Sequence, residues 1–218
     1  MWAGAAASDP HGEQAGRGHG EHEEARVRHH GGVTVTARPA TASDAPALAS
    51  VAALTFPLAC PPGTALADMA RFVTTVLSEQ RFDEYLADPT RHVLALEDDA
   101  AALGTPAPGA PLLGYAMLVT GDPADADVAA VVPARPAVEL SKLYVAPDAH
   151  GQGAAQVLME AALAAATATG ASSVWLGVNQ QNARAQAFYA KQGFERAGTK
   201  RFTVGTETHD DFVLVRAL

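Results

Sequence analysis

Cysteine is nearly absent from this chain of 218 residues, in which Cys60 is the single one. One thiol forms no internal disulfide, and no cysteine-based zinc cluster can be built from it. Such a composition fits a reducing compartment, so we expect a cytoplasmic location. Cys60 lies in a proline-rich segment without an accompanying Cys/His/Asp arrangement, and we interpret it as structural.

Long apolar runs and basic residues are also scarce. No stretch approaches the ~18–20 apolar residues of a membrane span, which argues against an integral membrane protein or a membrane partner. The first residues show no basic stretch followed by an apolar core, so we expect no secretory leader. Acidic residues outnumber basic ones by 24 to 15, and the formal charge is −9. This balance disfavours nucleic acid as a partner and favours a cationic small substrate, although it is also what keeps a protein soluble.

Apolar periodicity is missing from residues 1–32. This segment is rich in Gly, Ala, Glu and His and holds five of the eight histidines. It cannot bury enough apolar surface to offset the entropy of ordering a chain, so we expect a disordered tail. The histidines are scattered, and we expect no metal site among them. Residues 33–218 are then expected to form one domain.

Within that domain, alternating and β-branched segments predict strands over residues 33–38, 92–97, 112–120 and 137–145. Helical spacing predicts a first helix that ends before Phe56-Pro57-Leu58 and a second over residues 64–86. Farther along, we expect a helix up to about residue 169, a strand over 172–178, a helix over 182–192 and two last β segments at 201–204 and 211–216. Together these indicate an α/β fold with a central mixed sheet flanked by helices.

A glycine-containing turn joins the strand that ends at Val145 to the next helix. Its sequence, Pro147-Asp148-Ala149-His150-Gly151-Gln152-Gly153-Ala154-Ala155, brings backbone N–H groups and a helix N-terminus together, a combination suited to phosphate oxygens. A dinucleotide-binding fingerprint fails here, because its third glycine position is Gln156 and no acid follows about twenty residues later. A Walker loop fails because Gly-Lys-Ser/Thr is absent.

The second motif is Asn182-Ala183-Arg184-Ala185-Gln186-Ala187-Phe188-Tyr189-Ala190-Lys191-Gln192-Gly193-Phe194. Asn182 stands where it can cap a helix or bind a ligand amide. Tyr189 can pack in the core or present its hydroxyl to a reacting group.

These two motifs, in this order, resemble the GNAT superfamily of acyl-CoA-dependent N-acetyltransferases. The phosphate turn matches at Gly153 and Ala155, and the later motif Asn-x-x-Ala-x-x-Phe-Tyr-x-x-x-Gly-Phe matches throughout. The order of strands and helices from Val33 onward is also similar to the GNAT fold. One departure is His150, where the family usually has Arg or Gln.

The resemblance implies acetyl-CoA as co-substrate, without a metal, and a primary amine as acceptor. It places the pantetheine arm along Leu143, Tyr144 and Val145. The resemblance assigns the pyrophosphate to the backbone amides of Gly151, Gln152, Gly153, Ala154, Ala155 and Gln156, and the side chain of His150 can add a contact. Asn182 is expected to contact the pantetheine. Tyr189 is expected near the sulfur, as the general acid for the leaving thiolate.

The reaction also needs a base, because an ammonium group has no lone pair. Glu139, on the strand that enters the turn, is our first candidate, although it can equally be an exposed residue or an ion-pair partner of Lys142 or Arg135. The other candidates lie beside the last strand: His209, Asp210 and Asp211.

The acceptor is less defined. Segments such as Glu139-Leu140-Ser141-Lys142-Leu143-Tyr144-Val145 are similar to bacterial polyamine acetyltransferases, and Glu139, Glu207, Asp210 and Asp211 would give an acidic pocket. The same acids can be solvated loop charges. Two other functions stay open: a non-enzymatic acyl-CoA sensor, and an acetyltransferase for a protein N-terminus or lysine. Dimers are frequent in the family, which leaves a homodimer open.

Overall fold

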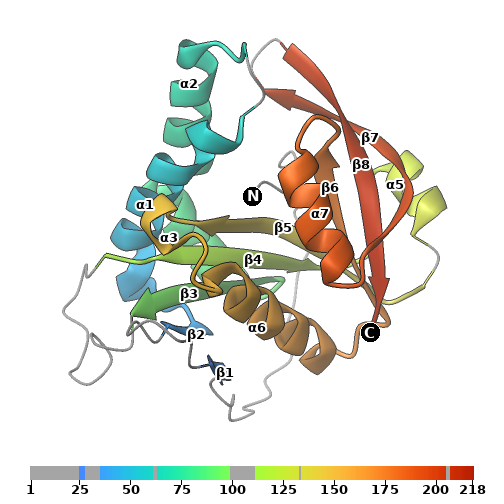
Figure 1. Cartoon of the computed structure of the whole chain (residues 1–218), viewed down its shortest axis with the longest axis horizontal. Coiled ribbons are helices and arrows are strands. Elements are labelled where there is room, and N and C mark those ends of the chain that lie inside the picture. The colour runs from blue at the N-terminus through green and yellow to red at the C-terminus, as the bar shows by residue number, and fades with distance from the viewer. Residues whose placement is uncertain (1–24, 28–34, 61–62, 99–110, 133, 205–206) are drawn as a thin grey trace.

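The computed structural model describes residues 25–27, 35–60, 63–98, 111–132, 134–204 and 207–218, with backbone alone for 25–27, 202–204, 207 and 209. Within these residues an eight-stranded sheet has the order β1-β2-β3-β4-β5-β6-β8-β7. The strands are β1 (Ala25–Val27), β2 (Val35–Pro39), β3 (Arg91–Asp98), β4 (Gly114–Thr120), β5 (Ala137–Val145), β6 (Ser173–Asn179), β7 (Glu195–Val204) and β8 (Glu207–Ala217). All neighbours are antiparallel except β5 and β6, which run parallel. The expected mixed sheet is confirmed (Figure 1).

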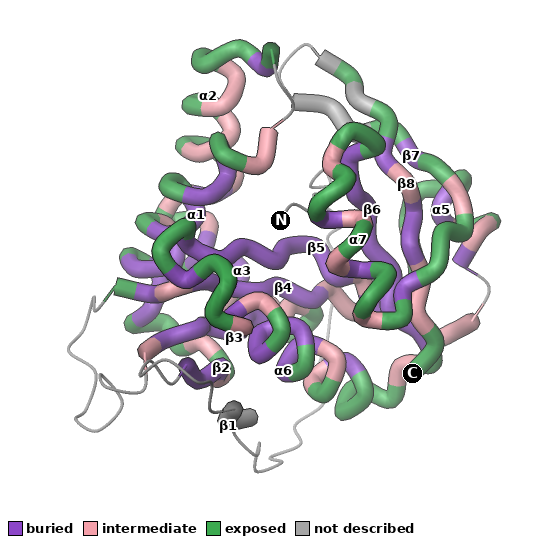
Figure 2. Tube along the Cα trace, in the orientation of Figure 1, coloured by how far each residue is buried: buried purple, intermediate pink, exposed green. Residues whose placement is uncertain are grey.

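Helices cover both faces of this sheet (Figure 1). One face carries α6 (Ala154–Ala168) and α7 (Ala183–Lys191), and the other carries α1 (Ala45–Ala59), α2 (Leu66–Val76) and α3 (Glu79–Ala87). Two hydrophobic clusters follow this division, one under α6 and α7 and one under α1 and α3. Figure 2 shows the central strands β4 and β5 buried between them, whereas α2 is half-buried to exposed.

The first half of the chain departs from its predicted helices. Helix α1 continues through Pro57 to Ala59, because the buried Phe56 anchors this last turn by stacking on Phe72 at a centroid distance of 4.4 Å. The single helix expected over residues 64–86 is two, because Ser78 accepts a hydrogen bond from the N–H of Arg81 and starts α3. Packing and capping thus override the local pattern.

An additional helix, α5 (Ala126–Val131), stands in a segment that the sequence predicted as a loop. The Asp125 carboxylate caps it by accepting from the N–H groups of Asp127 and Val128. Val128 is buried against Trp175 and Val213. The flanking prolines and glycine are typical of a loop, and they outweighed the capping signal of Asp125 in the prediction.

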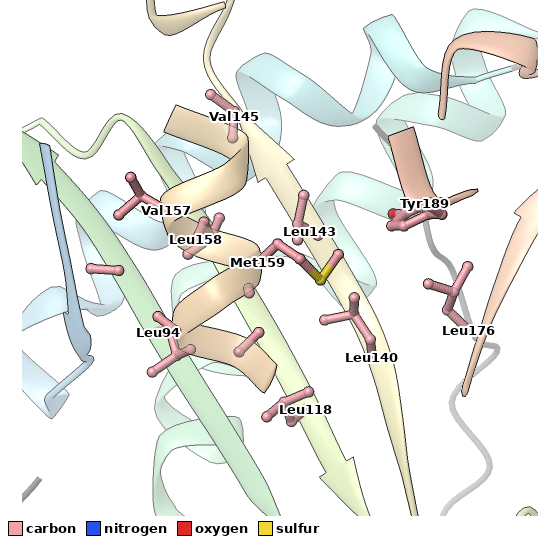
Figure 3. Packing of buried hydrophobic residues seen from close by; sticks show 14 of the residues in the cluster. Leu94, Leu118, Leu140, Leu143, Val145, Val157, Leu158, Met159, Leu176 and Tyr189 are labelled. Carbon is pink, nitrogen blue, oxygen red and sulfur yellow. The ribbon is translucent and has the colours of Figure 1, made fainter. Parts of the chain in front are cut away.

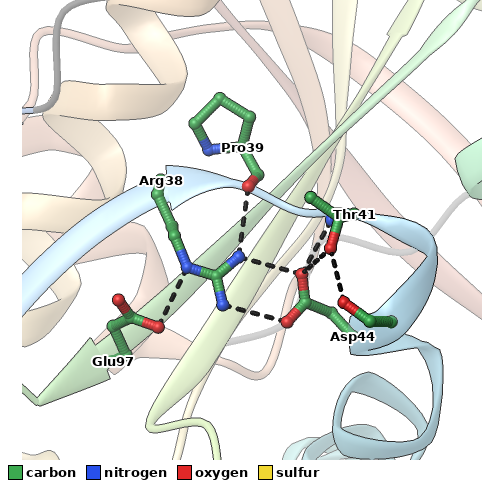
Figure 4. A network of polar contacts seen from close by, with 6 residues as sticks. Arg38, Pro39, Thr41, Asp44 and Glu97 are labelled. Carbon is green, nitrogen blue, oxygen red and sulfur yellow. Dashed lines mark hydrogen bonds and ion pairs between the residues drawn. The ribbon is translucent and has the colours of Figure 1, made fainter. Parts of the chain in front are cut away.

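An ion-pair network ties the first strand of the domain to the first helix (Figure 4). The Arg38 guanidinium donates to both Asp44 oxygens, at 2.8 and 2.9 Å, and to Glu97 at 2.9 Å. The Arg38 contact lowers the pKa of Asp44. The network therefore links β2 and β3 to the start of α1.

Two further expectations, a disordered N-terminal tail and the absence of a membrane span, concern the N-terminal part of the chain. The strand β1, within the predicted tail, pairs with β2, and the rest of that tail lies outside the described residues. The apolar helix Ala42–Ala59 is long enough to cross a membrane by length and composition. Its residues Leu48, Val51 and Phe56 pack against the sheet, so we assign this helix to the core.

Candidate active site

The parallel strands β5 and β6 separate part-way along their length. They pair at Ala137↔Ser173, Val138↔Val174 and Glu139↔Trp175. Within the described part of the chain, β5 and β6 do not pair with each other beyond Glu139 and Trp175. There β5 stays paired with β4 only, and β6 with β8 only. A wedge-shaped opening therefore begins at Glu139 and widens toward the carboxyl ends of both strands.

A β-bulge lies at the start of this opening. The register of β5 on β4 goes from Leu118↔Leu140 to Met117↔Lys142, so Ser141 is the extra residue. A bulge bends a strand and increases its twist. The bend turns the end of β5 away from β6 and also fixes which face Lys142 occupies.

The backbone of Val145 faces the opening. The neighbouring Ala146 N–H donates to Leu113 O on the β4 side, at 2.7 Å. Because successive residues of a strand point their N–H and C=O groups to opposite sides, those of Val145 point toward β6, and those of Leu143 do the same. The His150 ring contacts the Val145 carbonyl through Nε2 at 2.9 Å. The ring of His150, for which the resemblance allows a phosphate contact, thus lies against the strand end.

The glycine turn leads from this strand end into α6. Gly151 and Gly153 have φ angles of +80° and +78°, which side chains rarely adopt, and Gly153 is the N-cap of α6. Backbone hydrogen bonds in the turn come from His150 to Pro147 O and from Gln156 and Val157 to Gly153 O. The N–H groups of residues 151–155 donate to no group in the described part of the chain, which leaves them available to an anion at the positive end of the helix. Gln156 is the exception to the expected set.

Asn182 caps α7. Its Oδ1 accepts a hydrogen bond from the N–H of Ala185 at 3.0 Å. The sequence left capping and ligand binding open, and the structure shows the cap. The remaining amide Nδ2 is a donor that can still reach a ligand.

Tyr189 lies within the same face of the sheet as α6 and is 0% exposed. In Figure 3 it stands between β5 and β6, at the level of Leu143, with its hydroxyl turned toward β5. The ring meets Phe188 and Phe194 edge-on, and the hydroxyl has no hydrogen-bond partner among the described residues. Burial raises the pKa of Tyr189, so this hydroxyl stays protonated. A buried hydroxyl without a partner needs an explanation, and a ligand that accepts its hydrogen bond is one.

The opposite face of the opening carries charges. Glu139, at its narrow end, is half-buried and forms no ion pair with Lys142 or Arg135; Arg135 binds Asp122 instead, at 2.9 Å. Burial raises the pKa of Glu139 above its ordinary value, and the charges of Lys200 and Lys142 oppose that shift. A carboxylate with a raised pKa and no fixed partner can take up a proton.

Asp211 and Lys200 are neighbours across β8 and β7 on that same face. Asp211 is 0% exposed, and its carboxylate oxygens make no direct hydrogen bond to the described residues, although the Asn179 side chain lies near enough to lower its pKa. Burial raises the pKa of Asp211 to about 7 against the opposing charge of Lys200. The Lys200 side chain passes over Gly177 toward the Trp175 ring, 5.4 Å from Nζ. A Cβ on Gly177 would lie 3.3 Å from both Asp211 Oδ2 and Lys200 Cδ, so glycine makes room for the pair.

The remaining candidates add less. Asp210 is exposed, and the side chains of Glu207 and His209 lie outside the described residues. Cys60 is half-buried, donates to Phe56 O at 3.4 Å, and has a pKa raised by burial to about 11, which fits an unreactive thiol. No metal-binding group of His, Cys, Asp and Glu occurs in the described part of the chain.

A cleft of about 1050 Å³ lies elsewhere, between α5, α6, α7 and the outer strands. Its lining includes Lys191, Arg196 and Arg216 and none of the predicted site residues. We place the site at the strand separation instead, because the unpartnered Tyr189 hydroxyl and the free N–H groups converge there.

The family model for the Acetyltransferase (GNAT) family matches residues 64–194. The chain belongs to this family. It is 48% identical over 176 residues to an uncharacterized N-acetyltransferase of Mycobacterium tuberculosis (strain ATCC 25618 / H37Rv), covering 81% of this chain and 99% of the relative. This GNAT-family chain is therefore an N-acetyltransferase, as the motifs indicated.

Solved structures share the fold of this N-acetyltransferase. The PaiA N-acetyltransferase of Thermoplasma acidophilum, in complex with coenzyme A, has a TM-score of 0.63 at 18% identity, covering 84% of this chain and 99% of its own. A ribosomal-protein-alanine N-acetyltransferase from Brucella melitensis has a TM-score of 0.57 at 22% identity, covering 84% and 99%. At such identities the likeness shows the fold and leaves the acceptor open.

Sequence reasoning missed three features of this site: Lys200, Gly177 and the burial of Lys142. Lys142 entered only as an ion-pair partner for Glu139. Its position on a strand was readable, but the bulge that sets its face arises from pairing with β4 and leaves no local signal.

Proposed function

We propose that this N-acetyltransferase moves an acetyl group from acetyl-CoA to a primary amine of a small molecule, directly and within one ternary complex. The opening between β5 and β6 carries this proposal. It has backbone donors and the α6 N-terminus at one end, the Tyr189 hydroxyl on one face and Glu139 on the other. Holding both reactants in one opening gains rate through proximity.

The residues of the opening fit acetyl-CoA. The outward-facing backbone of Leu143 and Val145 suits an amide-bearing pantetheine, and the free N–H groups of residues 151–155 suit the pyrophosphate. Asn182 adds its Nδ2 donor. The relative from Thermoplasma acidophilum, solved with coenzyme A, supports this assignment.

Acetyl-CoA supplies the acetyl group as a thioester, and two residues manage the protons. Glu139 takes a proton from the acceptor ammonium, which frees the lone pair of the nitrogen. The Tyr189 hydroxyl hydrogen-bonds and then protonates the departing sulfur. The Val145 N–H can polarise the carbonyl. Overall, one C–N bond forms, one C–S bond breaks, and one proton is released for each ammonium consumed.

The polyamine hypothesis receives limited support from the described side chains. Glu139 and Asp211 share one face of the sheet, as an acidic pocket would need. Lys142 and Lys200 lie on the same face, so the described charges sum to about neutral and do not favour a polycation.

The first test is release of CoA from acetyl-CoA with a panel of amines, followed by a thiol reagent and corrected for Cys60. The panel holds spermidine, spermine, aminoglycosides, amino acids and a basic peptide. We expect turnover with a small primary amine. Silence across the panel with acetyl-CoA binding intact by calorimetry contradicts a small primary amine as the acceptor, whereas turnover with the peptide alone supports a protein acetyltransferase.

A glycine pair tests the phosphate turn separately from chemistry. Gly151 and Gly170 both have φ of +80° and open space where a Cβ would stand, but Gly170 lies at the far end of α6. We expect Gly151→Ala and Gly170→Ala to lower the free energy of unfolding equally, by about 1 kcal/mol. Gly151→Ala alone should weaken acetyl-CoA binding, about tenfold, because its methyl group enters the anion site.

Equal acetyl-CoA dissociation constants for the two variants, measured by calorimetry, would place the pyrophosphate elsewhere.

A further inference from the structure

Two of the three lysines of this protein are buried beside the opening. Lys142 is 4% exposed and Lys200 is 9% exposed, whereas Lys191 is exposed. Lysines are rarely buried without a partner, because removing an ammonium group from water is costly. The two buried lysines differ in what compensates that cost.

Lys200 is balanced by carboxylates. It is the charged neighbour that most strongly lowers the pKa of both Glu139 and Asp211. Its ammonium also lies 5.4 Å from the centre of the Trp175 ring, where the π-electrons favour a cation.

Lys142 is influenced by one carboxylate, Glu139, which raises its pKa without forming an ion pair with it. Its Nζ donates to Ser141 Oγ at a long 3.5 Å, and it forms no ion pair among the described residues. The ammonium lies 5.7 Å from the centre of the Tyr85 ring, which Arg81 and Arg91 also approach, at 5.1 and 4.8 Å.

The two arginines near Lys142 are themselves ion-paired, Arg81 with Glu84 and Arg91 with Asp88, so most of their charge is already balanced. Burial lowers the pKa of Lys142 to about 8; Glu139 opposes this shift, and Arg91 and Arg81 add to it more weakly. The position thus offers a cation that an incoming anion would stabilise.

Lys142 also has the right place to meet the acceptor. The bulge puts it on the face of β5 that Glu139 occupies, one step farther into the opening. An amine that gives its proton to Glu139 therefore has the Lys142 ammonium close beside it. A second ammonium group on the acceptor would be repelled there, and a carboxylate would be attracted.

We propose that the acceptor carries a carboxylate a few bonds from its reacting amine, as amino acids do, and that Lys142 binds this carboxylate. The inference rests on the proposed function, since it names the acceptor class of the same site. In this proposal the substrate carboxylate compensates the buried ammonium of Lys142, and Lys142 selects the substrate.

The test compares kcat/KM within pairs that differ by one carboxylate: phenylalanine and 2-phenylethylamine, lysine and cadaverine, ornithine and putrescine. We expect the wild-type enzyme to prefer the carboxylate-bearing member of a pair by about tenfold or more. In Lys142→Met the preference should fall to about one, mainly through a raised KM for the carboxylate-bearing member. Lys142→Gln, which keeps a hydrogen-bonding group and loses the charge, should behave in the same way.

Lys191→Met is the matched control, because it removes an exposed lysine far from the opening and should keep the preference. The inference is overturned if wild type prefers the decarboxylated amines or spermidine, or if both Lys142 variants retain the preference. Acetylation of such amines would leave the proposed function standing. Failure to acetylate any amine would overturn both, and this outcome is visible in the panel before any variant is made.

Discussion

Replacing Tyr189 by phenylalanine is expected to lower kcat by about 100-fold or more. The variant removes the one hydroxyl that the structure holds, buried and unpartnered, between β5 and β6. Without it, the sulfur must leave as an unprotonated thiolate in a site that excludes water. Acetyl-CoA binding should change little, because the hydroxyl serves the leaving group. Steady-state kinetics and calorimetry measure the two quantities.

Tyr115→Phe is the matched control for this variant. Tyr115 is also fully buried, and its hydroxyl also lacks a partner among the described residues, but it packs under α1 and α3 with Phe82. Both variants should keep or slightly raise the melting temperature, since each removes a desolvated polar group. If kcat fell equally in both, or in neither, the role of Tyr189 as general acid would be wrong.

Replacing Glu139 by glutamine is the second large effect. We expect kcat/KM to fall by about 100-fold, because glutamine cannot accept the proton of the ammonium group. Glu79→Gln, at an exposed position on α3, should have no effect. A carboxylate base works in its deprotonated form, so wild-type activity should be lost as the pH falls through the pKa of Glu139. Since burial raises that pKa, the loss begins at a higher pH than for an exposed glutamate.

Asp211→Asn separates the two carboxylates. If Asp211 is the base, wild-type kcat/KM falls below about pH 7, where the carboxylate becomes protonated, and Asp211→Asn removes this dependence. If Glu139 is the base, the acidic limb persists in Asp211→Asn and disappears in Glu139→Gln. Lys200 acts on both carboxylates, and Asp210 acts on Asp211, so either variant changes the pKa of the carboxylate that remains. The decisive observation is therefore whether the acidic limb of the pH profile is present, and its exact midpoint is not.

Much of the fold follows from local pattern. The strand predicted over residues 137–145 has the bounds of β5, and the helices and strands from residue 154 to 192 lie where periodicity and caps place them. Asn182 and Gly153 act locally, through a cap and a positive φ, so their positions are readable from the chain. Where packing or a hidden cap decided the outcome, as at Pro57 and Asp125, the prediction was wrong.

The sequence by itself determined the local features on which the proposed site is built: the glycine turn, the Asn182 cap, and Tyr189 within a recognisable motif. Tertiary structure alone decided that β5 leaves β6 after Glu139, that Tyr189 meets the resulting opening from one face, and that Lys142 and Lys200 meet it from the other. The reason is physical. Strand pairing and the bulge at Ser141 depend on contacts with distant segments, and the cost of burying a charge depends on neighbours that are far away in the chain.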